Sequence, residues 1–310
     1  MRSGKSLKKQ NKFAVVVVGN VGIDTNIYPE GDTIDFDVEA NFTTNHDYVG
    51  QAGGYASRGF ARLGYKTAFI GHVGDDFCGH YILKTFAADN IDSSGIFIDP
   101  AGTARSVNFM YKDGRRKNFY DGKSHMTLKP DLEKCRKIIS AAKVIHFNIP
   151  NWARHLLPVA RELNKIISVD LQDIVNIDDE YRQDFMKYAD VLFFSAVNFQ
   201  NPHPIIQKIW QKYSNKIIIS GMGKQGCALG KEGEIHYFPA IEFGGPVIDT
   251  NGAGDGLAVG FLSQYYLEDR SIAESINAAQ IVARHTCSQK ASTDNLITPE
   301  KLIKHLSDLA

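Results

Sequence analysis

The sequence predicts a doubly wound, three-layer α/β/α fold, in which one mainly parallel sheet lies between two layers of helices. Short, continuous runs of apolar and β-branched residues alternate along the chain with amphipathic segments. Uninterrupted apolar runs are typical of parallel strands covered on both faces, and their alternation with helical segments is typical of right-handed crossovers. The chain has no internal repeat, low-complexity tract or Pro-rich linker. We therefore expect one compact unit.

The individual elements follow from this alternation. We expect strands at the apolar runs 13–18, 66–70, 143–147, 166–169, 191–194 and 216–219. We expect helices at the segments with helical spacing of apolar residues, which are 54–63, 77–88, 131–141, 152–164, 203–213, 255–267 and 272–288.

Two segments, 24–50 and 103–121, interrupt the alternation. They are rich in Thr, Asp, Asn, Phe and Tyr, and the stretches 33–38 and 107–111 alternate with period two. Asp113-Gly114 is in addition a common hairpin turn. We therefore expect both segments to supply strands to one small, discontinuous β-sheet lid over the edge of the main sheet. Additional antiparallel strands of the main sheet are the alternative interpretation.

Composition restricts the class of protein. The 310 residues include 35 Lys and Arg and 35 Asp and Glu, so the net charge is zero. Dedicated nucleic-acid or membrane-surface binders need a basic excess, so we expect neither partner. No stretch approaches the roughly 18 apolar residues of a bilayer-spanning helix. We expect a disordered basic tail over 1–12 and a folded domain over 13–310, and the four scattered cysteines, without a CxxC pair, favour a cytoplasmic location.

The most informative motif is Asp249-Thr-Asn-Gly-Ala-Gly-Asp255. Apolar residues at helical spacing follow it, which predicts that a helix begins near Asp255. The turn Gly252-Ala253-Gly254 would then direct backbone N–H groups out of the helix N-terminus, where unpaired donors and the helix dipole favour anions. Asp255 would lie at the mouth of this site, where a carboxylate can accept the proton of an attacking hydroxyl during phosphoryl transfer. The alternative is an Asp-Gly turn with a capping carboxylate.

This motif resembles the C-terminal signature of the ribokinase-like (pfkB-type) carbohydrate kinase family. The segments 50–64 and 71–79 are similar to the N-terminal signature of that family, and the order of elements matches over 13–305. The resemblance implies a kinase that uses ATP and Mg²⁺. It also implies that Asp255 is the general base, that Gly252, Ala253 and Gly254 form the anion hole, and that Asp24 binds hydroxyls of the substrate.

The chain departs from the family pattern at the expected substrate site. Gly50 and Gln51 stand where the family usually has Gly-Gly, and Tyr55 stands where it usually has Asn. We expect these residues, with Asn148 at a strand end, to bind the acceptor. An aromatic ring in place of an amide disfavours ribose or simple fructose and favours a bulkier substrate.

The nucleotide site also departs from the pattern. The Asn-x-x-Glu segment of the family, which organises Mg²⁺, falls on Ser195-Ala-Val-Asn198 and lacks the acid, so a weaker dependence on Mg²⁺ is expected. Gly221-Met-Gly-Lys-Gln-Gly226 fits GxGxxG, but we expect two short strands after it instead of the helix of a dinucleotide-binding fold. The resemblance places the nucleotide at Ser195, Asn198, Gly221, Gly223, Gly226, Asn277 and Ile281. It also implies a site for K⁺ between the Asp249 region and the loop 289–293.

These observations favour an ATP-dependent kinase that phosphorylates a hydroxyl of a sugar or sugar derivative. Tyr55 and the aromatic residues of the lid keep a nucleoside kinase on the same fold open, and the missing acid keeps open a nucleotide-binding protein with little catalytic activity. A homodimer through the lid is also expected, because Ile34, Phe36 and Val38 are predicted to lie on one lid strand.

Overall fold

The computed structural model describes residues 11–32, 34–112, 116–214, 216–243, 245–290 and 292–309. Most of the predicted tail and the predicted turn at Asp113-Gly114 lie outside these ranges. Within them, a large sheet has nine strands in the order β13-β12-β11-β10-β9-β8-β1-β4-β5. The strands are β1 Phe13–Val18, β4 Thr67–Val73, β5 Asp92–Ile98, β8 Ala142–Phe147, β9 Ile166–Asp173, β10 Val191–Ser195, β11 Ile217–Gly221, β12 Cys227–Lys231 and β13 Glu234–Phe238.

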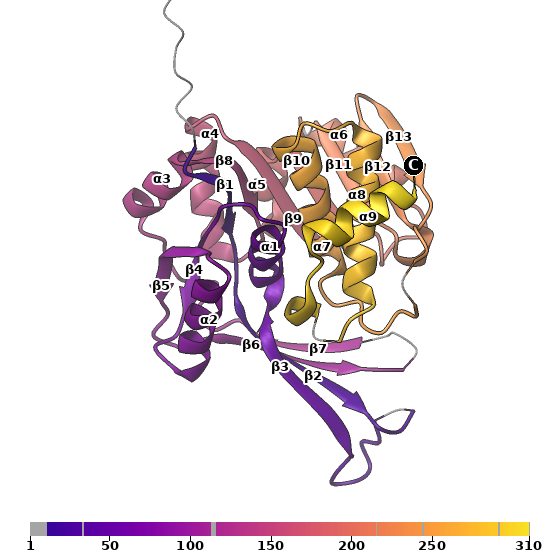
Figure 1. Ribbon diagram of the computed structural model, residues 1–310. Helices are drawn as coiled ribbons and strands as arrows, with labels where there is room; N and C mark the ends of the chain where they lie inside the picture. The colour runs from indigo at the N-terminus through magenta and orange to yellow at the C-terminus, as the bar shows by residue number, and fades with distance from the viewer. Residues whose placement is uncertain are drawn as a thin grey trace, which may run out of the picture.

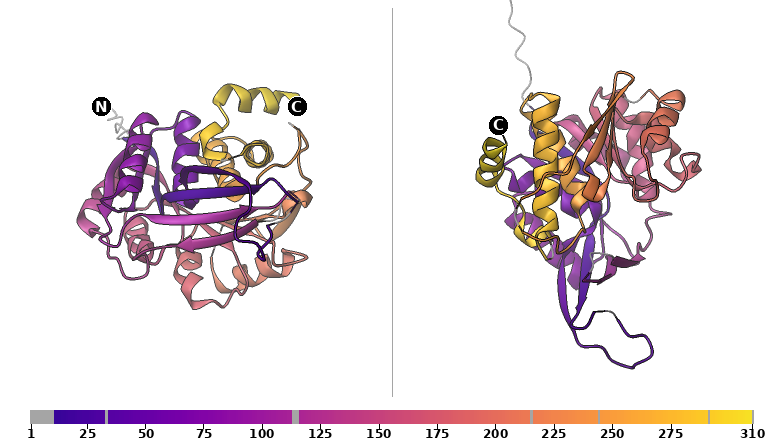
Figure 2. Two further views of the ribbon diagram at one scale, coloured as in Figure 1. Left: turned by 90° about the horizontal axis from the view of Figure 1, so that it is seen from below. Right: turned by 90° about the vertical axis from the view of Figure 1, so that its right-hand side faces the viewer.

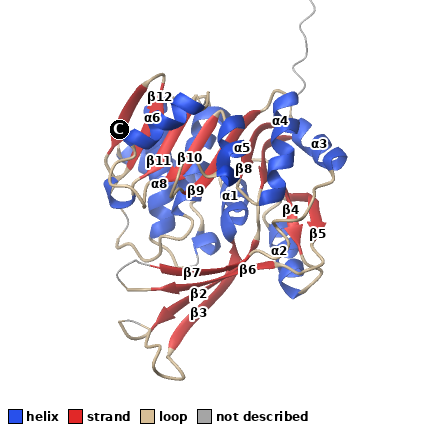
Figure 3. Ribbon diagram, turned by 180° about the vertical axis from the view of Figure 1, so that it is seen from behind, coloured by secondary structure: helices blue, strands red, loops and turns tan. Residues whose placement is uncertain are grey.

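Helices cover both faces of this sheet (Figure 1 and, from behind, Figure 3). One face packs against α1 Gln51–Arg62, α2 Phe77–Ala88, α7 Ala253–Leu262, α8 Ile272–Cys287 and α9 Pro299–Asp308. The other face packs against α3 Leu132–Ser140, the 3₁₀ turn Asn151–Leu156 with α4 Leu157–Glu162, α5 Glu180–Tyr188 and α6 His203–Lys212. The strands from β11 to β5 are all parallel, and β12 and β13 are antiparallel additions. The predicted three-layer, doubly wound α/β architecture is confirmed.

Four strands form a separate sheet, called the small sheet below. Its order is β3-β2-β6-β7, with β2 Gly22–Pro29, β3 Thr43–Gly50, β6 Ala104–Met110 and β7 Arg116–Asp121. The interpretation as extra strands of the main sheet is therefore wrong for these segments. The hairpin of β2 and β3 extends away from the body of the protein and carries a long loop at its end (Figure 2).

That loop contains the segment 33–38, which was predicted as a strand. Residues 34–42 have no regular structure, and Thr33 lies outside the described ranges. The backbone N–H of Asp35 donates to Oδ1 of Asn41 at 3.0 Å, and the N–H of Asp37 donates to Oδ1 of Asp35 at 2.9 Å. Such local side-chain hydrogen bonds compete with strand pairing, which explains why the alternating pattern failed. Phe36 in this loop is 73% exposed.

Some element boundaries also differ from the prediction. β5, α5 and α9 were not expected, and α7 begins at Ala253 instead of near Asp255. Gly252, with a φ of +79°, is the N-cap, so the helix begins two residues before the predicted position. The predicted end of this helix at residue 267 agrees with the structure, because a single π turn, Ser263–Leu267, continues α7.

The helices α7 and α8 are in close contact at Gly260, and a substitution there tests how tightly their backbones pack. A Cβ at Gly260 would lie 2.6 Å from Cα of Ala279 and 2.7 Å from the carbonyl oxygen of Ala278. Alanine normally favours a helix over glycine by about 1 kcal/mol, but here the backbones would have to separate. We expect Gly260→Ala to lower the free energy of unfolding by about 1–3 kcal/mol in urea unfolding experiments. Gly221→Ala is the control, because its Cβ would meet only Leu257, at 3.8 Å; an equal effect of the two changes would contradict this explanation.

Candidate active site

The order of strands in the large sheet indicates where a ligand should bind. β1 lies between β8 and β4, and the chain proceeds from it toward β5 on one side and, later, toward β11 on the other. Ligands of open α/β sheets bind beyond the carboxyl ends of the strands at such a switch point. Gly19 and Asn20 follow β1 there, Asn148 follows β8, and the small sheet lies across the same end of the large sheet (Figure 1).

The N-terminus of α7 lies beside this point and can bind an anion. Gly252 is its N-cap, and a Cβ there would lie 2.3 Å from Cδ1 of Tyr55, so the turn closes against this ring. Gly254 is exposed, and a Cβ on it would meet no atom within 4 Å. The N–H groups of Gly252 and Gly254 have no hydrogen-bond acceptor among the described residues. Both can therefore donate to a bound anion.

Asp255 is the third residue of α7. Its Oδ1 is buried and has no hydrogen-bond partner among the described residues. Burial and, next, the carboxylate of Asp170 raise the pKa of Asp255 well above its ordinary value, while Arg116 opposes the shift. A carboxylate with raised proton affinity is suited to taking a proton from a hydroxyl.

Asp24 lies on β2 and is 3% exposed. Its Oδ2 accepts hydrogen bonds from the N–H of Gln51 at 3.3 Å and from Nδ2 of Asn251 at 3.2 Å. Burial raises the pKa of Asp24 to about 6, against the effect of these hydrogen bonds. Gly50 allows the approach of this side chain, because a Cβ at Gly50 would lie 2.4 Å from Cγ of Asp24.

Asp249 connects the anion-binding turn with the small sheet. This carboxylate is fully buried, and its Oδ2 accepts from Nδ2 of Asn26 at 2.7 Å and from the hydroxyl of Tyr28 at 2.9 Å. Its Oδ1 accepts from the N–H of Asn251 at 2.7 Å. Burial raises the pKa of Asp249. Because both oxygens accept hydrogen bonds, Asp249 orients the turn that precedes α7.

The side chain of Asn251 extends this connection to three further residues. Its Nδ2 donates to the hydroxyl of Tyr48 at 3.0 Å as well as to Asp24, and its Oδ1 accepts from Arg116 on β7. The hydroxyls of Tyr48 and Tyr55 lie 2.7 Å apart. Tyr55, predicted to bind the acceptor, is 4% exposed and lies behind Gly252. Its ring supports the anion-binding turn and offers little surface for stacking.

Several buried polar atoms near Asp24 have no hydrogen-bond partner among the described residues. They are Oδ1 of Asp24, Nε2 of Gln51, Nδ2 and Oδ1 of Asn148, and Oδ1 of Asp255. Buried polar atoms without a partner are unfavourable, so such a set usually indicates a binding site. The set contains both donors and acceptors, which is what hydroxyl groups require. The predicted residues Asp24, Gln51, Asn148 and Asp255 share this property.

The predicted nucleotide residues occupy three places. Ser195 and Gly221 pair at the carboxyl ends of β10 and β11, and Gly221 approaches Leu257 in α7. Gly223 and Gly226, with φ of +58° and +95°, border the short turn Gly223–Gln225 that precedes β12 and β13, the two strands predicted there. On α8, Asn277 is half-buried, whereas Ile281 is fully buried in the core against α7.

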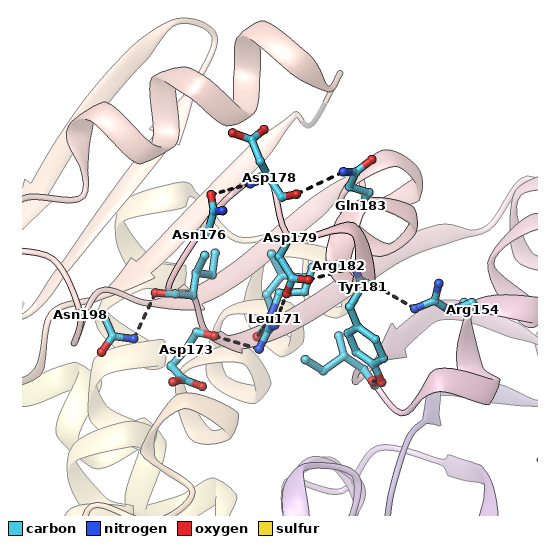
Figure 4. Close-up of polar contacts among 12 residues, drawn as sticks. Arg154, Leu171, Asp173, Asn176, Asp178, Asp179, Tyr181, Arg182, Gln183 and Asn198 are labelled. Carbon is cyan, nitrogen blue, oxygen red and sulfur yellow. Dashed lines mark hydrogen bonds and ion pairs between the residues drawn. The ribbon is translucent and has the colours of Figure 1, made fainter. Parts of the chain in front are cut away.

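Asn198 follows β10, and its side chain contacts the hydrogen-bonded connection between β9 and α5 (Figure 4). Its Nδ2 donates to the carbonyl of Ile174 at 3.1 Å. Arg182 donates to the carbonyl of Asp173 at 3.1 Å and to that of Leu171 at 3.4 Å. These contacts fix the irregular end of β9, where the register with β10 shifts. Asn198 therefore supports this connection, and its role in nucleotide binding stays a prediction.

Sequence reasoning missed Asp170, Asn251 and Arg116. Asp170 lies near the carboxyl end of β9, is 6% exposed, and burial raises its pKa to about 6. Its position directly after the apolar run 166–169 was a usable signal, because polar residues at the carboxyl ends of parallel strands often line sites. The pairing of Asn251 with Arg116 could not be predicted from the sequence, since it joins residues 135 positions apart in the chain.

Amides that can bind a phosphoryl group, next to a carboxylate that can take up a hydroxyl proton, form the arrangement of a phosphotransferase with an alcohol group as acceptor. The comparison with family models agrees with this class. Residues 12–299 match the pfkB family carbohydrate kinases, and the chain belongs to this family.

Individual relatives are carbohydrate kinases by name. An acarbose 7(IV)-phosphotransferase of Actinoplanes sp. is 25% identical over 302 residues, which cover 94% of this chain and 97% of the relative. Probable fructokinase-3 of Arabidopsis thaliana is 28% identical, with 80% and 79% covered. Among solved structures, a microbiome-derived acarbose kinase has a TM-score of 0.87 and 26% identity, with 95% of this chain and 99% of that chain covered. A ribokinase of Arabidopsis thaliana complexed with ribose and ATP, at 19% identity and a TM-score of 0.80 over 95% and 98% of the two chains, shares the fold.

The described residues include neither a membrane-spanning helix nor a cluster of metal-binding side chains. None of the helices in these ranges combines the length and the apolar character needed to cross a membrane. In the same part of the chain, no cluster of three or more His, Cys, Asp or Glu residues could hold a metal ion.

The raised pKa of Asp24 predicts a pH-dependent gain of stability on substitution. With a pKa of about 6 in place of the ordinary 3.8, the folded state binds the extra proton, so stability falls as the pH rises from about 4 to about 6. Asn cannot ionise, so we expect Asp24→Asn to be more stable than wild type at pH 8, by up to about 2 kcal/mol, and to lose this advantage at pH 4. Thermal unfolding at both pH values checks this, with Asp37→Asn in the exposed loop as control. An advantage that does not depend on pH would contradict the assignment.

Proposed function

We propose that the protein transfers the γ-phosphoryl group of ATP to a hydroxyl of a sugar or sugar derivative. The acceptor is held at the switch point by Asp24, Gln51 and Asn148, with one hydroxyl directed at Asp255. Asp255 accepts the proton of that hydroxyl as the oxygen attacks the phosphorus. The N–H groups at Gly252 and Gly254 stabilise the charge on the transferred group.

The observation that carries this proposal is the set of unpartnered buried polar atoms beside the start of α7. Burying Oδ1 of Asp24 and Oδ1 of Asp255 without donors is costly, and a ligand with several hydroxyls supplies donors to both and an acceptor to Nε2 of Gln51. The hydroxyls of one sugar can supply these donors and acceptors at the same time. The free N–H groups at the start of α7 lie beside them, where the phosphoryl group would be bound.

The nucleoside alternative receives no support from Tyr55. That interpretation rested on Tyr55 and on aromatic residues of the lid. Stacking on Tyr55 needs an accessible ring, and this ring is buried behind Gly252. The names of the relatives include kinases of acarbose, fructose-type sugars, 5-dehydro-2-deoxygluconate and fructosamine. We therefore propose a carbohydrate acceptor.

The ions implied by the family are part of the same proposal. Ser195 and Asn198 offer a hydroxyl and an amide without a carboxylate, which fits a Mg²⁺ ion held mainly by water and phosphate oxygens. Such an ion would offset the negative charge of those phosphates. A K⁺ ion near Asp249 would depend on backbone carbonyls, because both carboxylate oxygens accept hydrogen bonds.

The proposed homodimer would use the β2–β3 hairpin. Its loop exposes 73% of Phe36 and 84% of Phe42, although this segment is not the predicted strand. A cytoplasmic location also remains a prediction.

Replacement of the general base is the first test. We expect Asp255→Asn to reduce kcat by at least about a hundredfold, because the amide cannot accept the proton. Release of ADP with a phosphorylatable sugar is the measurement. Asp269→Asn, an exposed change just beyond the π turn, is the matched control and should retain wild-type turnover. Turnover of Asp255→Asn within a few-fold of wild type would show that Asp255 is not the base.

A methyl group at Gly254 tests the anion site. A Cβ there meets no atom within 4 Å, so Gly254→Ala should leave the free energy of unfolding within about 0.5 kcal/mol of wild type. The methyl group would occupy space that the transferred phosphoryl group needs. We expect kcat/KM for ATP to fall by about ten- to a hundredfold. Wild-type kinetics together with an unchanged fold would place the phosphate elsewhere.

A further inference from the structure

Three asparagines lie side by side on the face of the small sheet that carries Asp24. Asn26 of β2 pairs with Asn108 of β6, and Asn108 pairs with Asn118 of β7. Asp24 and Asn26 are two positions apart on one strand, so their side chains point to the same face. Asn26 and Asn108 are buried, whereas Asn118 lies on the exposed edge strand. These three residues are called the asparagine row below.

The asparagine row forms one chain of hydrogen bonds that ends on Asp249. Nδ2 of Asn118 donates to Oδ1 of Asn108 at 2.7 Å, and Nδ2 of Asn108 donates to Oδ1 of Asn26 at 2.9 Å. Nδ2 of Asn26 donates to Oδ2 of Asp249 at 2.7 Å. An ionised carboxylate only accepts hydrogen bonds, so Asn26 turns its NH₂ group to Asp249 and its oxygen to Asn108. The same requirement then orients the other two amides, so the carboxylate sets the direction of the whole chain.

Asp249 connects the asparagine row with the anion-binding turn. Its Oδ1 accepts from the N–H of Asn251 at 2.7 Å, and Asn251 directly precedes Gly252, the N-cap of α7. An amide that accepts a hydrogen bond becomes a stronger donor to the next group. The row therefore strengthens the hydrogen bond on Oδ2 of Asp249, and Asn108 acts on a turn to which it is linked only through Asn26 among the described residues.

Stability alone does not account for three amides in this place. Replacing two hydrogen-bonded partners by apolar groups of the same shape is often close to neutral for stability. A satisfied polar network instead specifies one arrangement of its members, which here restricts the orientation of Asp249. Donors that stabilise a transferred group need such a fixed arrangement, because a displacement of about 1 Å can cost a hundredfold in rate.

We propose that Asn26, Asn108 and Asn118 are positioning residues for phosphoryl transfer. They hold Asp249 in one orientation, and Asp249 in turn holds the N–H groups at Gly252 and Gly254 where the transferred group is bound. The position of the turn thus depends on all three strands that carry the row. This inference rests on the proposed function, because that function places the phosphoryl group at the turn.

Single replacements in the row are the first test. Asn26→Leu and Asn108→Leu keep the approximate size of the side chain and interrupt the chain of hydrogen bonds. We expect kcat for sugar phosphorylation to fall by at least about tenfold in Asn26→Leu and by about three- to tenfold in Asn108→Leu. KM for the acceptor should stay within about threefold of wild type, because the residues that hold the acceptor are unchanged. An unchanged kcat, or a loss confined to KM, would overturn the proposal.

Thr25→Val is the matched control. Thr25 precedes Asn26 on β2, so its side chain points to the opposite face, where its hydroxyl donates to Asp47. The variant thus removes a side-chain hydrogen bond of the small sheet without touching the row, and kcat should stay at the wild-type value. A loss in Thr25→Val as large as in Asn108→Leu would show a general effect of the sheet and overturn the proposal.

The double variant distinguishes a chain from two independent contributions. Once Asn26→Leu has interrupted the row beside Asp249, Asn108 no longer reaches the carboxylate. Asn26→Leu/Asn108→Leu should therefore lose no more of kcat than Asn26→Leu alone. Losses that multiply would show that the two residues act separately, which would overturn the proposal. Should the buried variants fail to fold, Asn118→Leu at the exposed edge decides: a two- to fivefold lower kcat supports the row, and an unchanged kcat overturns it.

Hydrogen exchange separates this inference from the proposed function. If the wild type phosphorylates no sugar, the proposed function fails, and the exchange rate of the backbone N–H of Asn251 decides about the row alone. This N–H donates to Asp249, so we expect it to exchange at least about fivefold faster in the row variants that fold than in wild type and Thr25→Val. Equal exchange rates would overturn the link between the row and the turn.

Discussion

Four carboxyl groups that are largely removed from water meet at one end of the large sheet, and much of the surrounding structure compensates for them. Asp24, Asp170, Asp249 and Asp255 all have a raised pKa because burial disfavours their ionised forms. The carboxylates differ in the hydrogen bonds that they accept. Asp249 accepts three, whereas one oxygen of Asp255 has no partner among the described residues. Arg116 opposes the shift at Asp24, Asp249 and Asp255. Buried acids with a raised pKa are thus concentrated at the carboxyl ends of the strands, as is common at functional sites.

The large sheet could be predicted because its signals are local. Apolar runs such as Phe13–Val18 became buried parallel strands, and the helix at 77–88 was found at its predicted positions. The strand predicted at 33–38 failed for a physical reason, since period-two alternation says nothing about whether a partner strand exists. Asp35 and Asn41 form local hydrogen bonds there instead. The start of α7 was misplaced because the pattern of apolar residues does not reveal the positive φ of Gly252.

The site was predictable only where one motif carries it. Asp255 with Gly252 to Gly254, and Asp24 with Gln51, were identified from short stretches, and the structure brings the two groups together through Asn251. Tyr55 shows the limit of this reasoning. The sequence showed its position relative to Gly50 and Gln51, but it did not reveal that the ring packs against Gly252. Arg116 and Asn251 lie 135 positions apart in the chain, so no local pattern could have paired them.

The placement of Asp24 and Asp255 on different parts of the fold has one more consequence. Asp24 belongs to β2 of the small sheet, whereas Asp255 belongs to α7, which is packed on the large sheet. Any displacement of the small sheet would change the spacing between these two carboxylates and break the link that Asn251 makes to Tyr48. The hydrogen bonds from Asn251 to Asp24 and Tyr48 therefore hold the small sheet in a fixed position relative to the start of α7.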